Sequence, residues 1–289
     1  MRIDIGDGTR LFFDVMGSAL RPDLDELRAK PTLLLLHGGP GFDHSSFRPY
    51  FDRFADTHQV IYLDHRGNGR SDGWGDAKHW NLDTWADDVV RFCDALEIVK
   101  PTVLGVSFGG FVAIRYAARH PDHPAKIVLS STATRRFPEL SASRFADLGG
   151  PEAAASYRRV FVDDDTTMEA MIDYATINLP LYGHVPSGFG PTRTMMNLAI
   201  IEGFNEGWFA MDLRPDLPKI TAPTLVLGGR DDPMTPHECS TEIAELLSPG
   251  VGQLEIFESC GHGSFRDQPD ATETTLRAFF ATDEETSAG

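Results

Sequence analysis

Short apolar runs alternate with helical patterns along most of this sequence, and that alternation constrains the fold more than any other feature. Six runs, at residues 32–36, 60–63, 102–105, 127–130, 224–227 and 254–257, are predicted to be buried strands. Residues 2–5 and 11–16 predict an opening antiparallel pair, and residues 82–96, 109–119 and 272–280 carry apolar side chains at helical spacing. We therefore expect an α/β fold with a mostly parallel, eight-stranded sheet flanked by helices.

The alternation stops between about residues 134 and 218, where no convincing buried strand occurs. Helical patterns at 151–161, 167–178 and 192–204 are separated there by Gly- and Pro-rich breaks such as LPLYGHVPSGFGP. We expect residues 134–218, called the cap segment below, to form a helical lid inserted into a core made of residues 1–133 and 219–289. Such a lid would cover a site at the carboxyl ends of the strands.

Composition and charge argue against several classes of partner. The formal net charge of −17 disfavours a nucleic-acid surface, which needs clustered Lys and Arg. No apolar run approaches the ~20 residues that span a bilayer, and the first residues resemble a strand rather than a signal peptide. We therefore expect a cytoplasmic protein that acts on a small molecule or short peptide. Its oligomeric state, a homo-oligomer included, stays open.

No motif predicts a metal or a cofactor. Cys93, Cys239 and Cys260 are an odd number of cysteines at wide spacing, which indicates neither a disulfide framework nor a zinc site. The sequence has no HExxH motif, no Walker loop and no GxGxxG that opens the first helix.

The strongest chemical signal is Gly105-Val106-Ser107-Phe108-Gly109, which lies between a predicted strand and a predicted helix. In this context G-x-S-x-G predicts a nucleophilic serine on a tight turn, with small residues that let strand and helix approach closely. The helix N-terminus behind Ser107 also favours developing negative charge.

A serine nucleophile needs a base, and the base needs an orienting acid. Of the ten histidines, His262 follows the last predicted strand and is the candidate base, whereas most of the others, such as His58, His120 and His123, suit surface loops. Two adjacent carboxylates, Asp231 and Asp232, follow the strand at 224–227, between serine and histidine in chain order. We choose Asp232, because Pro233 favours an extended backbone there, and keep Asp231 as the alternative.

Two further loops follow predicted strands. HGGPG at residues 37–41 lies where a second oxyanion donor is expected, so the N–H groups of Gly39 and Phe108 are the candidate oxyanion hole. DHRGNGRS at residues 64–71 is interpreted structurally, as a buried Asp–Arg pair that organises a turn beneath the site.

Together these motifs resemble the α/β-hydrolase superfamily over nearly the whole chain. HGGPG, DHRGNGRSD, GVSFGG, GGRDDP and CGH are similar to the motifs of the proline iminopeptidase group of serine aminopeptidases. The resemblance implies release of N-terminal residues, often proline, through an acyl-enzyme, with HGGPG as the oxyanion loop. Ser107 argues against the superfamily's dehalogenases and epoxide hydrolases, which use an aspartate nucleophile.

The resemblance also implies acidic residues that hold the substrate's free ammonium. Glu202 and Glu206 are four residues apart and would share one face of a helix, although such a pair is also typical of a solvated surface. Pro233 stands where some relatives carry a glutamate, which makes a carboxylesterase or lactonase the alternative. Trp208 is a candidate substrate contact, and its apolar neighbours fit an acyl pocket or merely the core of the lid: Met195, Met196, Phe204, Phe209 and Met211.

A non-catalytic ligand-binding protein on the same fold is a hypothesis from another class, since fold does not fix function. A cofactor-free oxidase or perhydrolase side activity on the same triad also stays open.

Overall fold

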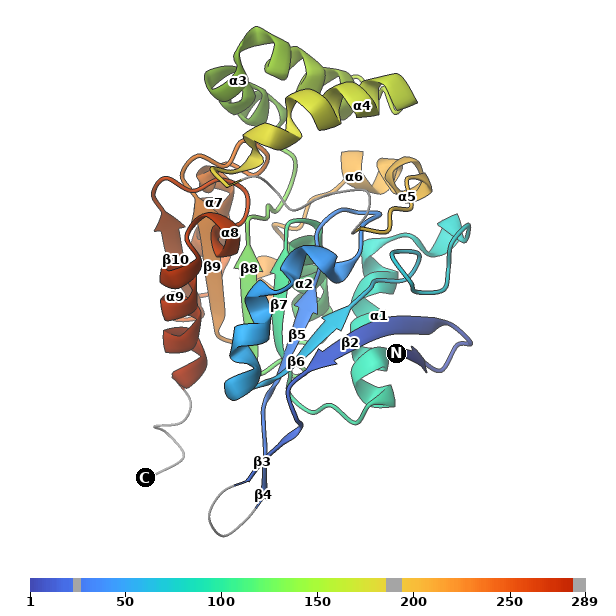
Figure 1. Cartoon of the computed structure of the whole chain (residues 1–289), viewed down its shortest axis with the longest axis vertical. Coiled ribbons are helices and arrows are strands. Elements are labelled where there is room, and N and C mark those ends of the chain that lie inside the picture. Colours follow the sequence, from blue (N-terminus) through green and yellow to red (C-terminus); the bar gives the residue numbers. More distant parts are fainter. Residues whose placement is uncertain (23–26, 186–193, 283–289) are drawn as a thin grey trace.

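The computed structural model describes residues 1–22, 27–185 and 194–282, and its centre is an eight-stranded sheet in the order β1-β2-β6-β5-β7-β8-β9-β10 (Figure 1). The strands are β1 (Arg2–Asp4), β2 (Arg10–Met16), β5 (Thr32–Leu36), β6 (Gln59–Leu63), β7 (Thr102–Val106), β8 (Lys126–Ser130), β9 (Thr224–Gly229) and β10 (Gly252–Phe257). β1 pairs with β2, and β2 with β6, antiparallel; the other neighbours are parallel. The predicted fold class is confirmed, and each expected strand ends within two residues of its predicted bounds.

A second sheet was not predicted. β3 (Leu20–Pro22) and β4 (Leu27–Ala29) pair antiparallel in a two-stranded hairpin at one end of the molecule (Figure 1). β3 and β4 have three residues each, LRP and LRA, and are too short and too polar to show an apolar periodicity in the sequence.

Both faces of the main sheet are buried along its central strands, β5 to β9, which explains why these strands are almost continuously apolar. In β5, Leu34 and Leu36 belong to a core on one face, whereas Leu33 and Leu35 belong to a core on the other. The first face is covered by α1 (Leu82–Ala95), α2 (Phe108–Arg119) and α7 (His237–Leu246). The opposite face is covered by the 3₁₀-helices η1 (His44–Phe47) and η2 (Tyr50–Asp56) together with α8 (Ser264–Asp267) and α9 (Pro269–Ala281).

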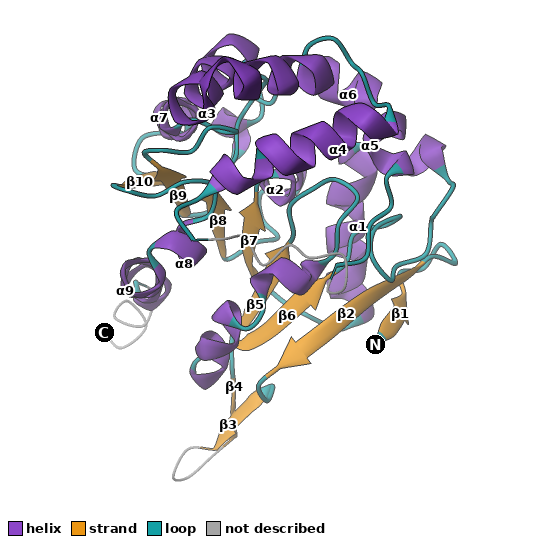
Figure 2. Cartoon of the chain, turned by 45° about the horizontal axis from the view of Figure 1, so that its top comes forward, coloured by secondary structure: helices purple, strands orange, loops and turns teal. Residues whose placement is uncertain are grey.

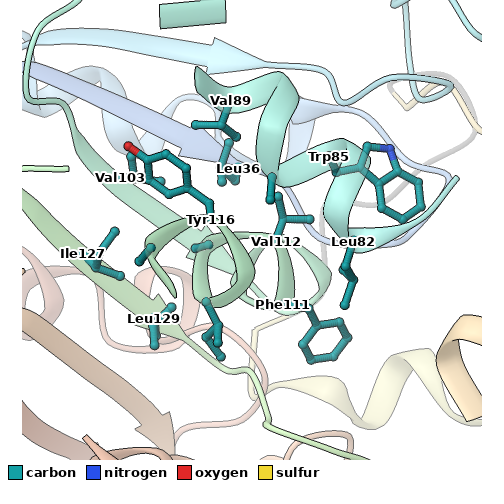
Figure 3. Packing of buried hydrophobic residues seen from close by; sticks show 14 of the residues in the cluster. Leu36, Leu82, Trp85, Val89, Val103, Phe111, Val112, Tyr116, Ile127 and Leu129 are labelled. Atoms are coloured by element: carbon teal, nitrogen blue, oxygen red, sulfur yellow. The ribbon is translucent and has the colours of Figure 1, made fainter. Parts of the chain in front are cut away.

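The α1–α2 pair shows how sequence spacing builds the first core. Trp85, Val89 and Phe92 recur every three or four residues, so they share the face of α1 that packs against α2 and the sheet. Figure 3 shows Trp85 and Val89 in this cluster. Asn81 caps this helix by accepting a hydrogen bond from Thr84 N at 2.9 Å. Full burial of each such side chain contributes about 1.5–3 kcal/mol.

Between β8 and β9, which are neighbours in the sheet, the chain leaves to form the helices of the cap segment. These are α3 (Pro138–Phe161), α4 (Met168–Ile177), α5 (Ala199–Gly203) and α6 (Asn205–Phe209), with the 3₁₀-helix η4 (Leu179–Tyr182) after α4. They lie beyond the carboxyl ends of the parallel strands (Figures 1 and 2). α3 and α4 share a cluster of buried side chains that includes Phe145, Tyr157 and Tyr174. α3 begins earlier than predicted and bends at Gly150, whose φ is 74°.

The predicted helix at 192–204 is wrong in its first half. Residues 194–198 have no helical assignment, and helix begins only at Ala199; residues 192 and 193 lie outside the described chain. The reason is that backbone donors there are used elsewhere: Met195 N donates to Asp43 Oδ2 at 3.0 Å, and Asn197 N to Gly41 O at 2.7 Å. Contacts with distant loops therefore replace the helical hydrogen bonds.

The remaining helical elements of the described chain are α7 and two 3₁₀ turns. α7 was not predicted, and 3₁₀ turns occur at η3 (Ala77–His79) and η5 (Leu217–Lys219). Within the described ranges, every helix is too short or too polar to cross a membrane.

Burial of His58 makes the stability of the fold depend on pH. Its ring lies 4.9 Å from that of Phe280, and burial lowers the pKa of His58 to about 4. The unfolded chain, with a pKa near ~6.5, binds more protons between these values, so stability must fall as pH drops through that window. Between pH 7 and 5 we expect this histidine to account for a loss of about 1–2 kcal/mol in the free energy of unfolding.

Urea unfolding of the wild type and of His58→Gln at pH 7 and 5 measures this contribution. The variant should lose less stability on acidification, whereas His79→Gln, whose side chain is 40% exposed, should behave like the wild type. An equal acid-induced loss in all three proteins would contradict the prediction.

Candidate active site

Ser107 lies at the turn between β7 and α2, in a backbone conformation that non-glycine residues rarely adopt. Its φ and ψ are 53° and −117°, and its N–H donates to Ser130 O at 3.0 Å. Thr132 Oγ1 donates to Ser107 O at 2.8 Å, which fixes the turn from the neighbouring strand. The serine is partly exposed, while its neighbours in both elements are buried. This is the strand–turn–helix geometry that the G-x-S-x-G pattern predicts.

The flanking glycines are required by contact distances. A Cβ atom on Gly109 would lie 2.0 Å from Leu36 O, and one on Gly105 would lie 2.3 Å from Gly109 O. Any larger residue would push α2 away from the ends of β5 and β7. The motif therefore specifies a close approach of helix and sheet. This approach holds Ser107 at the carboxyl end of β7.

Asp232 and His262 are hydrogen bonded to each other. His262 Nδ1 lies 2.8 Å from Asp232 Oδ2, and the two residues follow β9 and β10 at the edge where Ser107 follows β7. Asp232 is fully buried and His262 is 6% exposed. Because a carboxylate accepts hydrogen bonds, Nδ1 is the donor in this contact, and in a neutral imidazole the lone pair is then on Nε2.

The carboxylate of Asp232 is held by three further donors. Oδ1 accepts from Met234 N and Thr235 N, both at 2.9 Å, and Oδ2 accepts from Thr235 Oγ1 at 2.8 Å. Thr235 was not singled out from the sequence, although a hydroxyl three residues after a buried aspartate is a typical turn partner.

Asp231, the alternative acid, points elsewhere. Its Oδ2 lies 2.9 Å from His184 Nε2 at the surface, and its side chain is 37% exposed. Of the two adjacent carboxylates, the structure therefore brings only Asp232 to His262.

The HGGPG loop lies beside Ser107. A Cβ atom on Gly38 would be 3.4 Å from Ser107 Cβ, so this glycine is in van der Waals reach of the serine. Gly39 has a φ of 136°, which requires glycine. Within the described residues, neither Gly39 N–H nor Phe108 N–H donates to another group of the protein, so both donors are available to a ligand.

Two buried histidines connect this loop to the next one. His37 Nδ1 donates to Gly38 O at 2.7 Å, and its Nε2 accepts from His65 N at 3.3 Å. The rings of His37 and His65 lie 4.5 Å apart, and that of His65 lies 5.5 Å from Phe108. Burial lowers the pKa of His37 and lowers that of His65 well below its ordinary range, so both are neutral at pH 7.

The expected Asp–Arg pair inside DHRGNGRS is wrong. Asp64 instead accepts from His44 Nδ1 at 2.7 Å and from Arg70 N at 2.9 Å. Arg66 donates to both carboxylate oxygens of Asp88 in α1, each at 2.7 Å, and also to Asp7. The turn is organised partly by contacts within the motif, such as that of Arg70 N with Asp64. It is organised partly by Asp7, His44 and Asp88, which lie too far away in sequence for spacing to identify them.

The candidate ammonium anchors do not share one helix. Glu202 is exposed in α5, and Glu206 belongs to α6 after a break at Phe204. The side chain of Glu206 lies outside the described part of the chain. Phe204, between the two helices, keeps helical dihedral angles, and the expectation that the two carboxylates converge on one cation stays a prediction.

Trp208 packs on α2 and on the cap segment, with its ring 5.6 Å from Phe111 and 6.3 Å from Phe161. Its Nε1 is buried without an acceptor among the described residues. Of the apolar side chains proposed for an acyl pocket, Phe204 and Met211 are buried in the main core, and Phe209, Met195 and Met196 are exposed.

Comparisons with known proteins agree on the fold and differ in activity. A model of the alpha/beta hydrolase fold family matches residues 31–269. The chain is similar to 2-hydroxymuconate semialdehyde hydrolase of a Pseudomonas species, with 28% identity over 251 residues and 86% of each chain covered. It is similar to proline iminopeptidase of Lactobacillus helveticus, with 27% identity over 272 residues that cover 85% of this chain and 88% of the relative. The crystal structure of proline iminopeptidase from Mycobacterium smegmatis matches with a TM-score of 0.72 and 20% identity over 96% of both chains.

The Arg66–Asp88 pair should be a major contributor to the stability of the loop beneath the site. Both side chains are 3% exposed, and removal of one partner of a buried pair leaves an uncompensated charge. We expect Asp88→Asn to lower the free energy of unfolding by about 3–5 kcal/mol. Asp87, the neighbour of Asp88 in α1, makes surface pairs with Arg119 of α2 and with His120, and Asp87→Asn should cost less than about 1 kcal/mol. Equal urea midpoints for the two variants would refute the assignment.

Proposed function

We propose that this chain, which belongs to the α/β-hydrolase family, is a serine hydrolase that transfers an acyl group to water through Ser107. The observation that carries the proposal is the 2.8 Å hydrogen bond between His262 Nδ1 and Asp232 Oδ2, at the sheet edge where Ser107 stands in a strained turn. The hydrogen bond selects the tautomer of the neutral imidazole whose Nε2 can accept a proton, which is what a base for a serine hydroxyl needs.

The proposed mechanism has two steps, acylation of Ser107 by the substrate and hydrolysis of the resulting acyl-enzyme. Ser107 Oγ attacks the carbonyl carbon of the substrate while His262 Nε2 takes the serine proton, and Asp232 stabilises the imidazolium that forms. The N–H groups of Gly39 and Phe108 then bind the oxyanion, and the loss of one such donor typically costs about 3 kcal/mol. His262 protonates the leaving group and afterwards activates the water that releases the acyl group from Ser107.

For the specific activity we propose a proline iminopeptidase-like aminopeptidase that releases N-terminal residues from short peptides. Support comes from the HGGPG loop beside Ser107 and from the similarity to a relative named proline iminopeptidase. Such an enzyme needs an acidic partner for the substrate's ammonium, and the acidic candidates from the sequence are Glu202 and Glu206.

A carboxylesterase or lactonase is the second candidate, favoured by a specific observation. Glu202, the candidate ammonium anchor whose side chain the structure describes, is exposed in α5. A hydrolase of uncharged esters needs no ammonium anchor, so it would use the same serine, histidine and aspartate without these glutamates.

The two adjacent aspartates give a matched test of the proposed triad. Asp232→Asn should lower kcat by about 10⁴-fold, because the imidazole loses the carboxylate that fixes its tautomer. Asp231→Asn removes the same charge one residue away and should retain kcat within a few-fold. A comparable loss in both variants, measured with one activated ester, would count against the triad.

The substrate class is decided by kcat/KM for three substrates: a prolyl arylamide, its N-acetylated counterpart and a short p-nitrophenyl ester, with Ser107→Ala as control. The aminopeptidase predicts turnover of the free-amine amide that is lost on acetylation and lost in Glu202→Gln/Glu206→Gln. Ester turnover alone, abolished in Ser107→Ala, would retain the serine hydrolase and reject the peptidase. Turnover that survives in Ser107→Ala would reject both the aminopeptidase and the esterase or lactonase, because each requires Ser107 as nucleophile.

A further inference from the structure

The end of η4 in the cap segment contacts the loop that carries His262. His262 N donates to Tyr182 O at 2.5 Å, and the ring of Tyr182 meets the imidazole edge-on at 5.1 Å between centroids. The phenol of Tyr182 is held in turn by Tyr174 Oη of α4, at 2.7 Å. The backbone of His262 is thus anchored to the cap segment, while its side chain is anchored to Asp232.

One carboxylate joins the two segments. Asp267, the last residue of α8, accepts from Gly261 N at 2.8 Å through Oδ2. The same side chain accepts from His184 N at 3.1 Å and from Val185 N at 3.0 Å. It therefore binds the residue before His262 and the two residues that follow the η4 turn, which are more than eighty positions distant in sequence from Asp267.

The contact between the two segments leaves no space for side chains. A Cβ atom on Gly261 would lie 2.2 Å from Tyr182 O, and one on Gly183 would lie 3.0 Å from Asp267 Oδ1. Glycine at 261 lets the two backbones touch, and glycine at 183 leaves room for the carboxylate of Asp267. The same stretch of chain reaches the preceding loop as well, because His184 Nε2 lies 2.9 Å from Asp231 Oδ2.

We propose that Asp267 is a positioning residue: its carboxylate clamps residues 182–185 to the 261–262 loop and so aims the imidazole of His262 at Asp232 and Ser107. The inference deepens the proposed function and rests on it. Without the carboxylate, three backbone N–H groups lose their acceptor, and the loop is free to move relative to Asp232. Displacement of a catalytic group by about 1 Å can cost on the order of 100-fold in rate.

The kinetic test compares Asp267→Ala, the near-isosteric Asp267→Asn, and Asp270→Asn as a control that removes an exposed charge in α9. Turnover of the p-nitrophenyl ester is expressed per site titrated with a fluorophosphonate, so that a misfolded fraction does not count. We expect kcat to fall about 10- to 100-fold in Asp267→Ala with KM nearly unchanged. Asp267→Asn should lose less, because its amide oxygen still accepts, and Asp270→Asn should match the wild type.

A second readout does not depend on turnover. The hydrogen-bonded Nδ1–H of His262 should give a low-field proton resonance, identified by its absence in Asp232→Asn. We expect this signal to shift or broaden in Asp267→Ala and to stay unchanged in Asp270→Asn. If the wild type shows no Ser107-dependent turnover, the proposed function fails and the resonance alone decides the positioning role. An unchanged kcat per site, or an unchanged resonance in Asp267→Ala, would overturn the proposal.

Discussion

The close approach of α2 to the ends of β5 and β7 is the constraint on which the rest of the site depends. Because Gly109 leaves no room for a Cβ atom against Leu36 O, the helix begins almost in contact with the sheet. The chain can enter that helix only through a strained residue, and this residue is Ser107, with φ at 53°. The packing of the core thus supports a local conformation that would otherwise cost of order 1–3 kcal/mol.

The loops at the carboxyl ends of the strands are hydrogen bonded to one another. His37 accepts from His65 N, Gly41 N donates to Asn68 Oδ1, and Asn197 Nδ2 donates to Gly67 O. Buried polar groups of this kind are stabilising only when each has its partner, so the loops must fold together. The HGGPG loop is held beside Ser107 by this network, which is the preorganisation that oxyanion binding requires.

Much of the fold could be predicted because both faces of the sheet are buried. Strands such as Thr32–Leu36 then show uninterrupted apolar runs, and candidate residues such as Ser107 and His262 directly follow such runs. The sequence favoured Asp232 over Asp231 only through Pro233, since both carboxylates follow β9. Only the fold shows that Asp231 faces His184 at the surface.

What sequence patterns missed depends on contacts between distant segments. Asp88 is the partner of Arg66, and Asn197 uses its backbone N–H on Gly41, so no local spacing signals either contact. The same holds for Asp267, whose three donors come from two separate loops. Hydrophobic periodicity indicates which face of one helix or strand is buried. The hydrogen bonds of Asp88, Asn197 and Asp267 depend instead on which distant segments lie side by side in the fold.

In the proposed mechanism, Ser107 carries the acyl group of the substrate during turnover. The most direct measurement is rapid quenching of the wild type with a slowly deacylating p-nitrophenyl ester, followed by mass spectrometry of the proteolytic peptides. We expect one acyl adduct, on the peptide that contains Ser107 and on the serine itself, formed at the rate of the p-nitrophenol burst. Turnover of the ester with no adduct on Ser107, or with the adduct on another residue, would contradict it.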